Sequence, residues 1–192
     1  LGFLAGKMRD LLIDTVLIED YDRIIFLDGD RIPTQVNYTQ LEIENNSDKY
    51  TSFIYLAEND YRLPFFNKNN SRYPAFSVPR ILATAGISVS TFLLKKVREI
   101  PLFKGRCFPE EFDGLPSHED STFGIALLKS KVNFLKGNAF KLKGEFNPSI
   151  KKSYVKNYDK AQVIYYRFQK SLLGENYGLS NLSNKECQHC ES

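Results

Sequence analysis

The sequence predicts an α/β domain, and three observations support that prediction. The chain has 192 residues, of which 42% are hydrophobic and 26% are charged, the composition of an ordinary globular domain. The hydrophobic period switches several times between helical steps of three or four residues and short apolar runs typical of strands. No apolar run approaches the roughly 18 residues that span a bilayer. We therefore expect a soluble domain with no transmembrane segment.

Charge and cysteine content narrow the classes of partner and compartment. Lys and Arg number 26 against 23 Asp and Glu, and the resulting charge of +3 is too small for the basic surface that duplex nucleic acid requires. Three cysteines form no disulfide framework, which favours a reducing compartment. We expect a cytoplasmic protein, with peripheral membrane attachment as an alternative. Cys187 and Cys190 lack the second ligand pair that a structural zinc site needs, so a loose tail is favoured there.

The residue pattern over the N-terminal third of the chain predicts two helices and two strands. Apolar residues recur at helical spacing over 7–19, and a continuous apolar run over 23–27 predicts a central strand that is covered on both faces. Thr34 is placed to cap a helix that runs to residue 44, and residues 51–57 predict a second strand. This region therefore alternates helix and strand, as an α/β domain does.

The remaining residues continue the alternation after a long irregular stretch. Residues 58–80 are rich in Tyr, Phe, Asn and Pro without a steady period, which predicts a long functional loop. We expect the following elements in order: strand 81–85, a break at Gly86, helix 91–99 capped by Ser90, loop 108–118, helix 119–129, strands 132–135 and 139–143, helix 154–173, and a polar tail from 174.

Asp28 and Asp30 form the sharpest local feature. They follow a predicted strand, and ligands of open α/β sheets bind outside the carboxyl ends of strands. Two carboxylates one residue apart repel each other unless a cation neutralises them, and hard divalent cations prefer oxygen ligands. Such an ion can bridge to a diphosphate. The alternative is a surface turn in which Asp-Gly bends the chain.

Glu119 and Asp120 open the predicted helix over 119–129. The helix dipole stabilises negative charge in the first turn, and an ionised carboxylate there can accept a proton from a hydroxyl nucleophile. The alternative is an ordinary helix start, in which Ser117 or His118 supplies the cap.

These features, in this order, resemble the GT-A glycosyltransferases, most closely the family 2-like enzymes and the galactosyltransferase C-terminal-like domains. The resemblance covers about residues 1–144 and implies a GT-A-like mixed sheet flanked by helices. It divides the chain into a partial catalytic domain, 1–150, and a C-terminal helix with a polar tail, 151–192. The matching segments are Asp28-Gly29-Asp30, Ala85-Gly86-Ile87-Ser88, Phe108-Pro109-Glu110-Glu111-Phe112-Asp113-Gly114 and Glu119-Asp120.

On the donor side, the resemblance implies that Asp28 and Asp30 hold Mn²⁺ or Mg²⁺ against the diphosphate of a nucleotide sugar, with a UDP-sugar the expected donor. Gly86 matches the glycine of the loop under the donor sugar, where a side chain would collide. Arg9 lies where the family often has Ala-Arg-Asn, whose Arg lies near the nucleotide. A guanidinium there would stabilise the charge of the leaving diphosphate.

On the acceptor side, Glu119 and Asp120 match the family pair that addresses the acceptor, and Asp120 corresponds to the general base of inverting members. Sugars stack on aromatic rings, so the long loop is expected to contact the glycan, lipid-linked or protein acceptor. The loop aromatics concerned are Tyr61, Phe65, Phe66 and Tyr73.

Two departures from the family pattern stand out. Members often supply a late metal-binding His, but this stretch reads Phe140-Lys-Leu-Lys-Gly144, so that Lys141 or Lys143 would supply a positive charge instead. The first two family strands, which bind base and ribose, should precede Leu1, so we expect an N-terminally truncated, incomplete enzyme.

Two other interpretations stay open beside a metal-dependent, hexosyltransferase-like enzyme. A catalytically silent GT-A-like binding domain would keep the fold without the full site. A haloacid dehalogenase-type phosphatase also has Asp-x-Asp after an apolar strand. That family, however, has Thr or Val where this chain has Ile32, and its motif follows the first strand of the fold.

Overall fold

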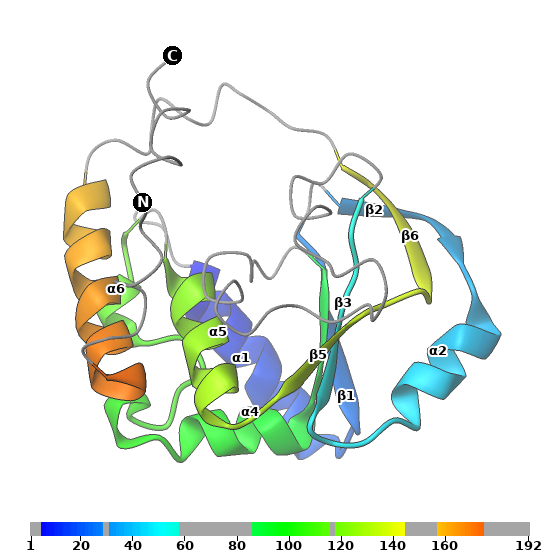
Figure 1. Ribbon diagram of the computed structural model, residues 1–192, viewed down its shortest axis with the longest axis horizontal. Helices are drawn as coiled ribbons and strands as arrows, with labels where there is room; N and C mark the ends of the chain where they lie inside the picture. The colour runs from blue at the N-terminus through cyan, green and yellow to red at the C-terminus, as the bar shows by residue number, and fades with distance from the viewer. Residues whose placement is uncertain (1–4, 29–30, 58–85, 116–117, 145–156, 175–192) are drawn as a thin grey trace.

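The computed structural model describes most of the chain and contains a mixed α/β fold (Figure 1). The described residues are 5–28, 31–57, 86–115, 118–144 and 157–174. Their helices are α1 (Ala5–Ile18), α2 (Tyr38–Asn45), α4 (Thr91–Arg98), α5 (Glu119–Lys129) and α6 (Tyr158–Leu173). Their strands are β1 (Arg23–Phe26), β2 (Arg31–Val36), β3 (Thr51–Ile54), β4 (Ile87–Ser90), β5 (Asn133–Lys136) and β6 (Phe140–Gly144).

The main sheet is mixed, as the family resemblance implies. Its strand order is β1-β4-β3-β5, in which β4 runs antiparallel to both neighbours while β3 and β5 run parallel. A second, two-stranded sheet pairs β2 with β6 in antiparallel fashion. A bridge between Ala57 and Leu142 joins the chain after β3 to β6. The sheet therefore combines chain segments that lie far apart in the sequence.

Helices cover both faces of the main sheet, and alternate strand residues separate the two cores. Ile54 of β3 belongs to the large core, which α4, α5 and α6 complete, whereas its neighbours Phe53 and Tyr55 belong to a smaller core. Leu41 of α2 packs against the smaller core. Figure 1 shows α1, α4, α5 and α6 on one side of the sheet and α2 on the other.

A buried carboxylate organises the smaller core. The Tyr55 hydroxyl donates a hydrogen bond to Glu44 Oε2 at 2.6 Å, and the backbone N–H groups of Asn138 and Ala139 donate to Oε1 at 2.7 and 3.1 Å. Burial raises the pKa of the Tyr55 phenol, and the adjacent Glu44 raises it further, so the phenol keeps its proton. This carboxylate thereby fixes the turn between β5 and β6 to α2.

Helices α4 and α5 form where the sequence predicts them. Ser90 caps α4, since its Oγ accepts a hydrogen bond from Leu93 N at 3.2 Å. Leu93 and Val97 are buried, as their helical spacing indicates, and Phe92 is partly buried against the same core. Helix α5 begins at Glu119 and ends at Lys129, the bounds predicted from the sequence.

Helix α6 belongs to the same core as the preceding elements. Its Ala161, Tyr165, Phe168 and Leu172 are buried there. The Phe168 ring packs edge-on against Phe103, with 5.6 Å between the ring centroids. The C-terminal helix therefore contributes to the packing that holds α5 in place.

Two predicted elements differ in the structure. The helix expected from Thr34 begins only at Tyr38, because residues 31–36 pair with β6 as strand β2. The Asn37 side chain supplies the cap and accepts from Gln40 N at 3.1 Å. Strand β1 was expected at the centre of a sheet, but among the described strands it lies at the edge and pairs with β4 alone.

Several predicted features lie outside the described residues. They are the aromatic loop over 58–80 with Tyr61, Phe65, Phe66 and Tyr73, the strand over 81–85, the polar tail with Cys187 and Cys190, and the start of the helix predicted from residue 154.

Candidate functional site

Arg9 brings together three of the acidic residues that the sequence singles out. Its Nη1 lies 2.8 Å from Asp120 Oδ1 and 3.3 Å from Glu119 Oε1, while Nη2 lies 3.1 Å from Asp28 Oδ1. Asp120 lies 111 positions from Arg9 in the chain. These four residues come from α1, from the end of β1 and from the first turn of α5. We call them the Arg9 cluster.

Close packing of α1 against Phe108 and the first turn of α5 places the guanidinium. A Cβ on Gly6 would lie 3.0 Å from Phe108 Cβ and 3.8 Å from Glu119 Cβ, so a glycine lets this turn of α1 approach its neighbours. The Arg9 guanidinium carbon lies 5.6 Å from the centroid of the Phe108 ring, within the range of a cation–π contact. The Arg9 side chain is 18% exposed and therefore partly shielded from solvent.

The Arg9 guanidinium stays charged in this setting. Burial by itself lowers its pKa, but the nearby carboxylates of Asp120, Asp28 and Glu119 outweigh burial, and the pKa of Arg9 is raised above its usual value. The site therefore combines a permanent cation with carboxylates. A guanidinium can bind an anion, and a carboxylate beside it can accept a proton.

The first turn of α5 presents Glu119 and Asp120 without a side-chain cap from His118. The backbone of His118 is left-handed, with φ of 75°. Its ring stacks on Tyr165 of α6, with 5.0 Å between centroids and 19° between planes, and also contacts Tyr158. Capping by the His118 side chain is thus contradicted, while Ser117 lies outside the described residues.

The packing of the main sheet requires a glycine at position 86. Its φ is +126°, and a Cβ would lie only 2.6 Å from the carbonyl oxygen of Tyr55. The Gly86 carbonyl accepts a hydrogen bond from Tyr55 N at 2.8 Å. The close approach of two strands explains the glycine without a ligand, and its contact with a donor sugar stays a prediction.

The predicted metal ligands are described only in part. Asp28 is partly exposed, with 35% of its side chain accessible, and Asp30 lies outside the described residues. Across the described ranges, no three His, Cys, Asp or Glu side chains are arranged to hold a metal ion. Asp28 offers carboxylate oxygen, which both Mn²⁺ and Mg²⁺ prefer, and binding of either ion stays a prediction.

The lysines predicted to stand in for the late histidine lie on β6. Lys141 and Lys143 are both exposed. Lys141 also lines a cavity of about 240 Å³ at the turn between β5 and β6, together with Lys136 and Phe140. Both lysines lie on the two-stranded sheet with β2, and their role toward an anionic ligand stays a prediction.

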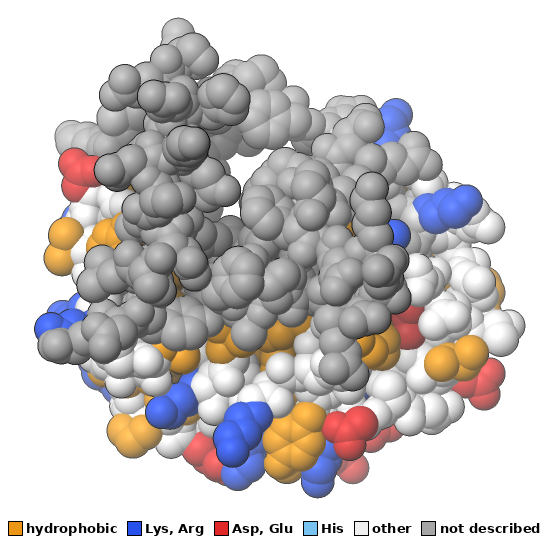
Figure 2. Space-filling view, in the orientation of Figure 1, with side chains coloured by type: hydrophobic (Ala, Val, Ile, Leu, Met, Phe, Trp, Pro, Cys, Tyr) orange, Lys and Arg blue, Asp and Glu red, His pale blue; other side chains and the backbone are white. Residues whose placement is uncertain are grey.

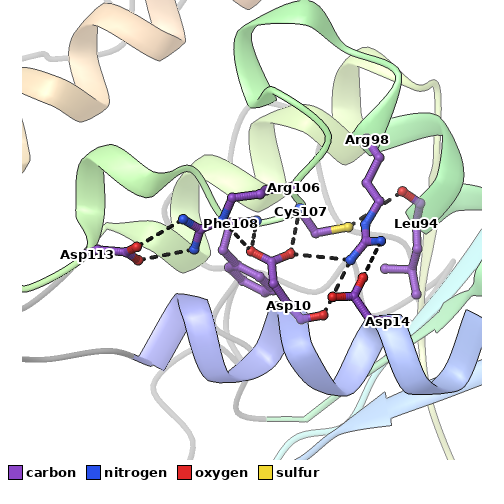
Figure 3. Close-up of polar contacts among 8 residues, drawn as sticks. All are labelled: Asp10, Asp14, Leu94, Arg98, Arg106, Cys107, Phe108 and Asp113. Atoms are coloured by element: carbon purple, nitrogen blue, oxygen red, sulfur yellow. Dashed lines mark hydrogen bonds and ion pairs between the residues drawn. The ribbon is translucent and has the colours of Figure 1, made fainter.

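Sequence reasoning missed the residue next to Arg9. The Asp10 carboxylate accepts hydrogen bonds from Cys107 N at 2.7 Å, from Phe108 N at 3.3 Å and from Arg106 Nε at 3.0 Å (Figure 3). Arg106 in turn holds Asp113 through two parallel bonds of 2.9 and 3.1 Å. We call these residues the Asp10 cluster.

A second arginine ties the same turn of α1 to α4. Arg98 Nη1 lies 2.7 Å from Asp14 Oδ1, and Arg98 Nη2 lies 3.8 Å from Asp10 Oδ1. Burial raises the pKa of Asp10, and the hydrogen bonds from Cys107 and Arg106 oppose that shift. The resemblance places Asp10 where the family has Asn, but the three donors around it suit a carboxylate better than an amide.

Comparison with models of known protein families gives no match for this chain, and comparison with curated proteins gives none either. Within the described ranges, every helix is too short or too polar to cross a bilayer. Figure 2 shows the Lys and Arg side chains on the described part of this face as small, separate groups.

Proposed function

We propose that this chain is part of a hexosyltransferase-like glycosyltransferase, which transfers a sugar from a nucleotide-diphosphate sugar, expected to be a UDP-sugar, to an acceptor hydroxyl. One observation carries the proposal. Arg9, Asp28 and Asp120 come from three separate segments that resemble GT-A glycosyltransferases, and the Arg9 guanidinium contacts both carboxylates.

The geometry supports separate roles for Arg9, on the side of the leaving diphosphate, and for Asp120, on the side of the acceptor. In an inverting transfer, the acceptor oxygen bonds to the anomeric carbon, and the bond from that carbon to the diphosphate oxygen breaks with its electron pair. The acceptor proton passes to Asp120, which the N-terminus of α5 helps to keep ionised. Arg9 stabilises the negative charge that develops on the leaving diphosphate.

The expected divalent cation would be held on the donor side. Asp28 with Asp30 would bind Mn²⁺ or Mg²⁺, and when bound the cation supplies further positive charge beside the diphosphate. Lys141 or Lys143 would add charge from β6. A glycan, lipid-linked or protein acceptor, contact with the aromatic loop, and a cytoplasmic or peripheral membrane location belong to the same proposal.

A catalytically silent binding domain is the second candidate. The 2.8 Å ion pair between Arg9 and Asp120 favours it, because a domain that binds a nucleotide sugar without turnover can use the same pair as a structural contact. Turnover therefore separates the two candidates.

A panel of UDP-sugars with and without Mn²⁺ tests the proposal on the full natural polypeptide that contains this chain. We expect metal-dependent nucleotide binding and slow donor hydrolysis. Asp120→Asn should abolish turnover and spare binding of UDP with Mn²⁺, whereas the exposed control Asp159→Asn should change neither.

Four outcomes would contradict parts of this proposal. Absence of metal-dependent nucleotide binding overturns it, and turnover by Asp120→Asn removes that residue as the base. Binding without turnover supports the silent domain. Cleavage of aryl phosphates that Asp28→Asn stops would identify a phosphatase instead.

A further inference from the structure

We propose that the cavity at the turn between β5 and β6 binds an anionic group of the acceptor, a phosphate or a carboxylate, through Lys136 and Lys141. The inference rests on the proposed function and deepens it, because it names a chemical class of acceptor. It follows from the place of this cavity on the main sheet and from the charges that line it. We call it the β5–β6 cavity.

The β5–β6 cavity lies on the same edge of the main sheet as Asp28. Strands β1, β3 and β5 run in one direction, because β4 is antiparallel to β1 and to β3, while β5 is parallel to β3. Their carboxyl ends therefore share one edge, which is where ligands of open α/β sheets bind. Asp28 follows β1, Leu56 of the cavity follows β3, and Lys136 of the cavity ends β5.

The strand register sets the separation between Asp28 and the cavity. Phe26 of β1 and Ile54 of β3 both pair with Ile87 of β4. Asp28 and Leu56 each follow two residues later, so they reach a similar level at the edge of the sheet. Neighbouring strands lie about 4.8 Å apart, and two such spacings amount to about 10 Å. One acceptor molecule can therefore reach from the candidate site into the cavity.

Both charge and apolar surface line the β5–β6 cavity. Its volume is about 240 Å³, with apolar side chains from Leu56, Phe140 and Leu142 beside the two lysines. Pockets for whole small molecules commonly measure about 300 to 1,000 Å³, so this cavity suits one charged group with the atoms attached to it. Two ammonium groups beside apolar walls fit a phosphate or a carboxylate that is carried on a larger molecule.

The charges of Lys136 and Lys141 are not used by the described part of the fold. Both lysines are exposed, and within the described ranges neither of them forms an ion pair. The Glu44 carboxylate that holds the turn is buried, and both of its oxygens accept hydrogen bonds from other groups. The two ammonium groups can therefore bind an anion without first breaking a salt bridge.

The turn that carries the cavity is fixed from behind. A Cβ on Gly137 would collide with the ring of Tyr55, so a glycine lets the turn pack closely against β3. The next two backbone N–H groups, of Asn138 and Ala139, donate to Glu44 at 2.7 and 3.1 Å. A binding site on a fixed turn loses little conformational entropy when a ligand enters it.

The pairing of β2 with β6 separates Lys141 from Lys143. Lys143 pairs with Ile32 near the start of β2, whereas Lys141 pairs with Gln35 near its end. The start of β2 is the end beside Asp28, whose carbonyl accepts a hydrogen bond from the first residue of the strand. Lys143 therefore stays the candidate for the donor side, while Lys141 belongs to the β5–β6 cavity.

Binding of small probes tests the cavity in the absence of UDP and metal. The backbone amide NMR resonances of Gly137 and Asn138 are followed in the full natural polypeptide during titration with inorganic phosphate, with glucuronate and with glucose. We expect saturable shifts with at least one of the two anions and none with glucose. A response to phosphate alone or to glucuronate alone tells which anion the acceptor carries. No saturable shift with either anion, or an equal response to glucose, would overturn the proposal.

Lys136→Gln is the decisive variant, because the proposed function gives Lys136 no role. It should bind the effective anion about tenfold more weakly than the wild type, while its other amide resonances report that the chain is folded. The control Lys95→Gln removes an exposed charge on α4 and should bind the anion as the wild type does. Equal affinity in Lys136→Gln and the wild type would contradict the role of the lysine.

A second titration tests whether the bound anion stands for the acceptor. With the wild type saturated by UDP and Mg²⁺, the anion should still bind, because donor and acceptor occupy a transferase together and the cavity lies about 10 Å along the edge from Asp28. Mutual exclusion of UDP and the anion would place the cavity in the donor site and overturn the assignment to the acceptor.

The two proposals fail in different ways. Binding of UDP with Mg²⁺ but of neither anion overturns the cavity proposal alone. Binding of an anion by a chain that does not bind UDP overturns the proposed function, and the assignment to an acceptor falls with it.

Discussion

Arg9 and Asp10 are neighbours in α1, yet the clusters around them are built in opposite ways. In the Arg9 cluster, one guanidinium contacts three carboxylates, whose side chains are 12% to 35% exposed. In the Asp10 cluster, one carboxylate that is 9% exposed accepts hydrogen bonds from two backbone amides and an arginine. Successive helix residues point about 100° apart, so each meets a different part of the molecule.

The difference separates a buried structural ion pair from a partly exposed one that a ligand could reach. The Asp10 carboxylate has well-placed donors around both oxygens, which is what a buried charge needs in order to stabilise a fold. The Arg9 cluster gathers several like charges around one cation at a partly exposed position, an arrangement that a ligand can change. Short distances alone do not separate the two clusters.

The largest expected effect is a loss of stability in Asp10→Ala. Removing this carboxylate leaves two buried amides and the Nε of Arg106 without their acceptor, which should cost about 3 to 5 kcal/mol of unfolding free energy. Arg9→Ala should cost about 1 to 2 kcal/mol. Urea unfolding measures both values, and equal losses in the two variants would remove the distinction between the clusters.

Labelling of Cys107 should sharpen the same comparison. Burial, with a smaller contribution from Asp10, raises the pKa of this thiol to about 12, so it should react with a thiol reagent only when the Asp10 cluster opens. Asp10→Asn should speed labelling by about tenfold, whereas Arg9→Gln should not. The measurement needs serine at positions 187 and 190, and rapid labelling of the parent protein would contradict the prediction.

The smallest expected effect concerns His118, which joins the Arg9 cluster to α6 by stacking instead of by charge. Burial lowers its pKa, so the unfolded chain binds the proton more readily than the folded one. Stability should therefore fall as pH falls through the unfolded pKa of about 6.5 toward the lower folded value.

His118→Phe keeps a ring for Tyr165 and removes the titration. When the pH is lowered from about 7.5 to 5.5, the free energy of unfolding of this variant should fall by less than that of the wild type. Urea unfolding at both pH values measures the difference, and the same loss in both proteins would show that His118 does not titrate differently on folding.

Local signals in the sequence predicted the helices well and the strand pairing poorly. The period of apolar residues and the Ser90 cap were sufficient for α4, because these signals act within one or two turns. The second half of strand β2, residues 34–36, was mistaken for the start of a helix, because its partner β6 lies far along the chain and leaves no trace near residue 31. Long-range pairing of this kind has no local period to detect.

In the candidate site, too, some features could be predicted from the sequence and others could not. The convergence of Arg9 with Asp28 and Asp120 agrees with positions that the family resemblance had already selected. The role of Asp10 was missed, because two of its partners are backbone amides of Cys107 and Phe108, and a backbone group has no residue type to recognise. Its only sequence signal was the position beside Arg9.

The pairing of the strands also sets the order in which a newly synthesised chain can acquire its structure. Strands β1, β4 and β3 can associate once residue 90 has left the ribosome, but β3 gains its parallel partner only with β5, and β2 stays unpaired until β6 emerges. Asp120 reaches Arg9 at a similarly late stage. We expect the growing chain to expose unpaired strand edges until residue 144 is made, which is the period in which a chaperone would protect it from aggregation.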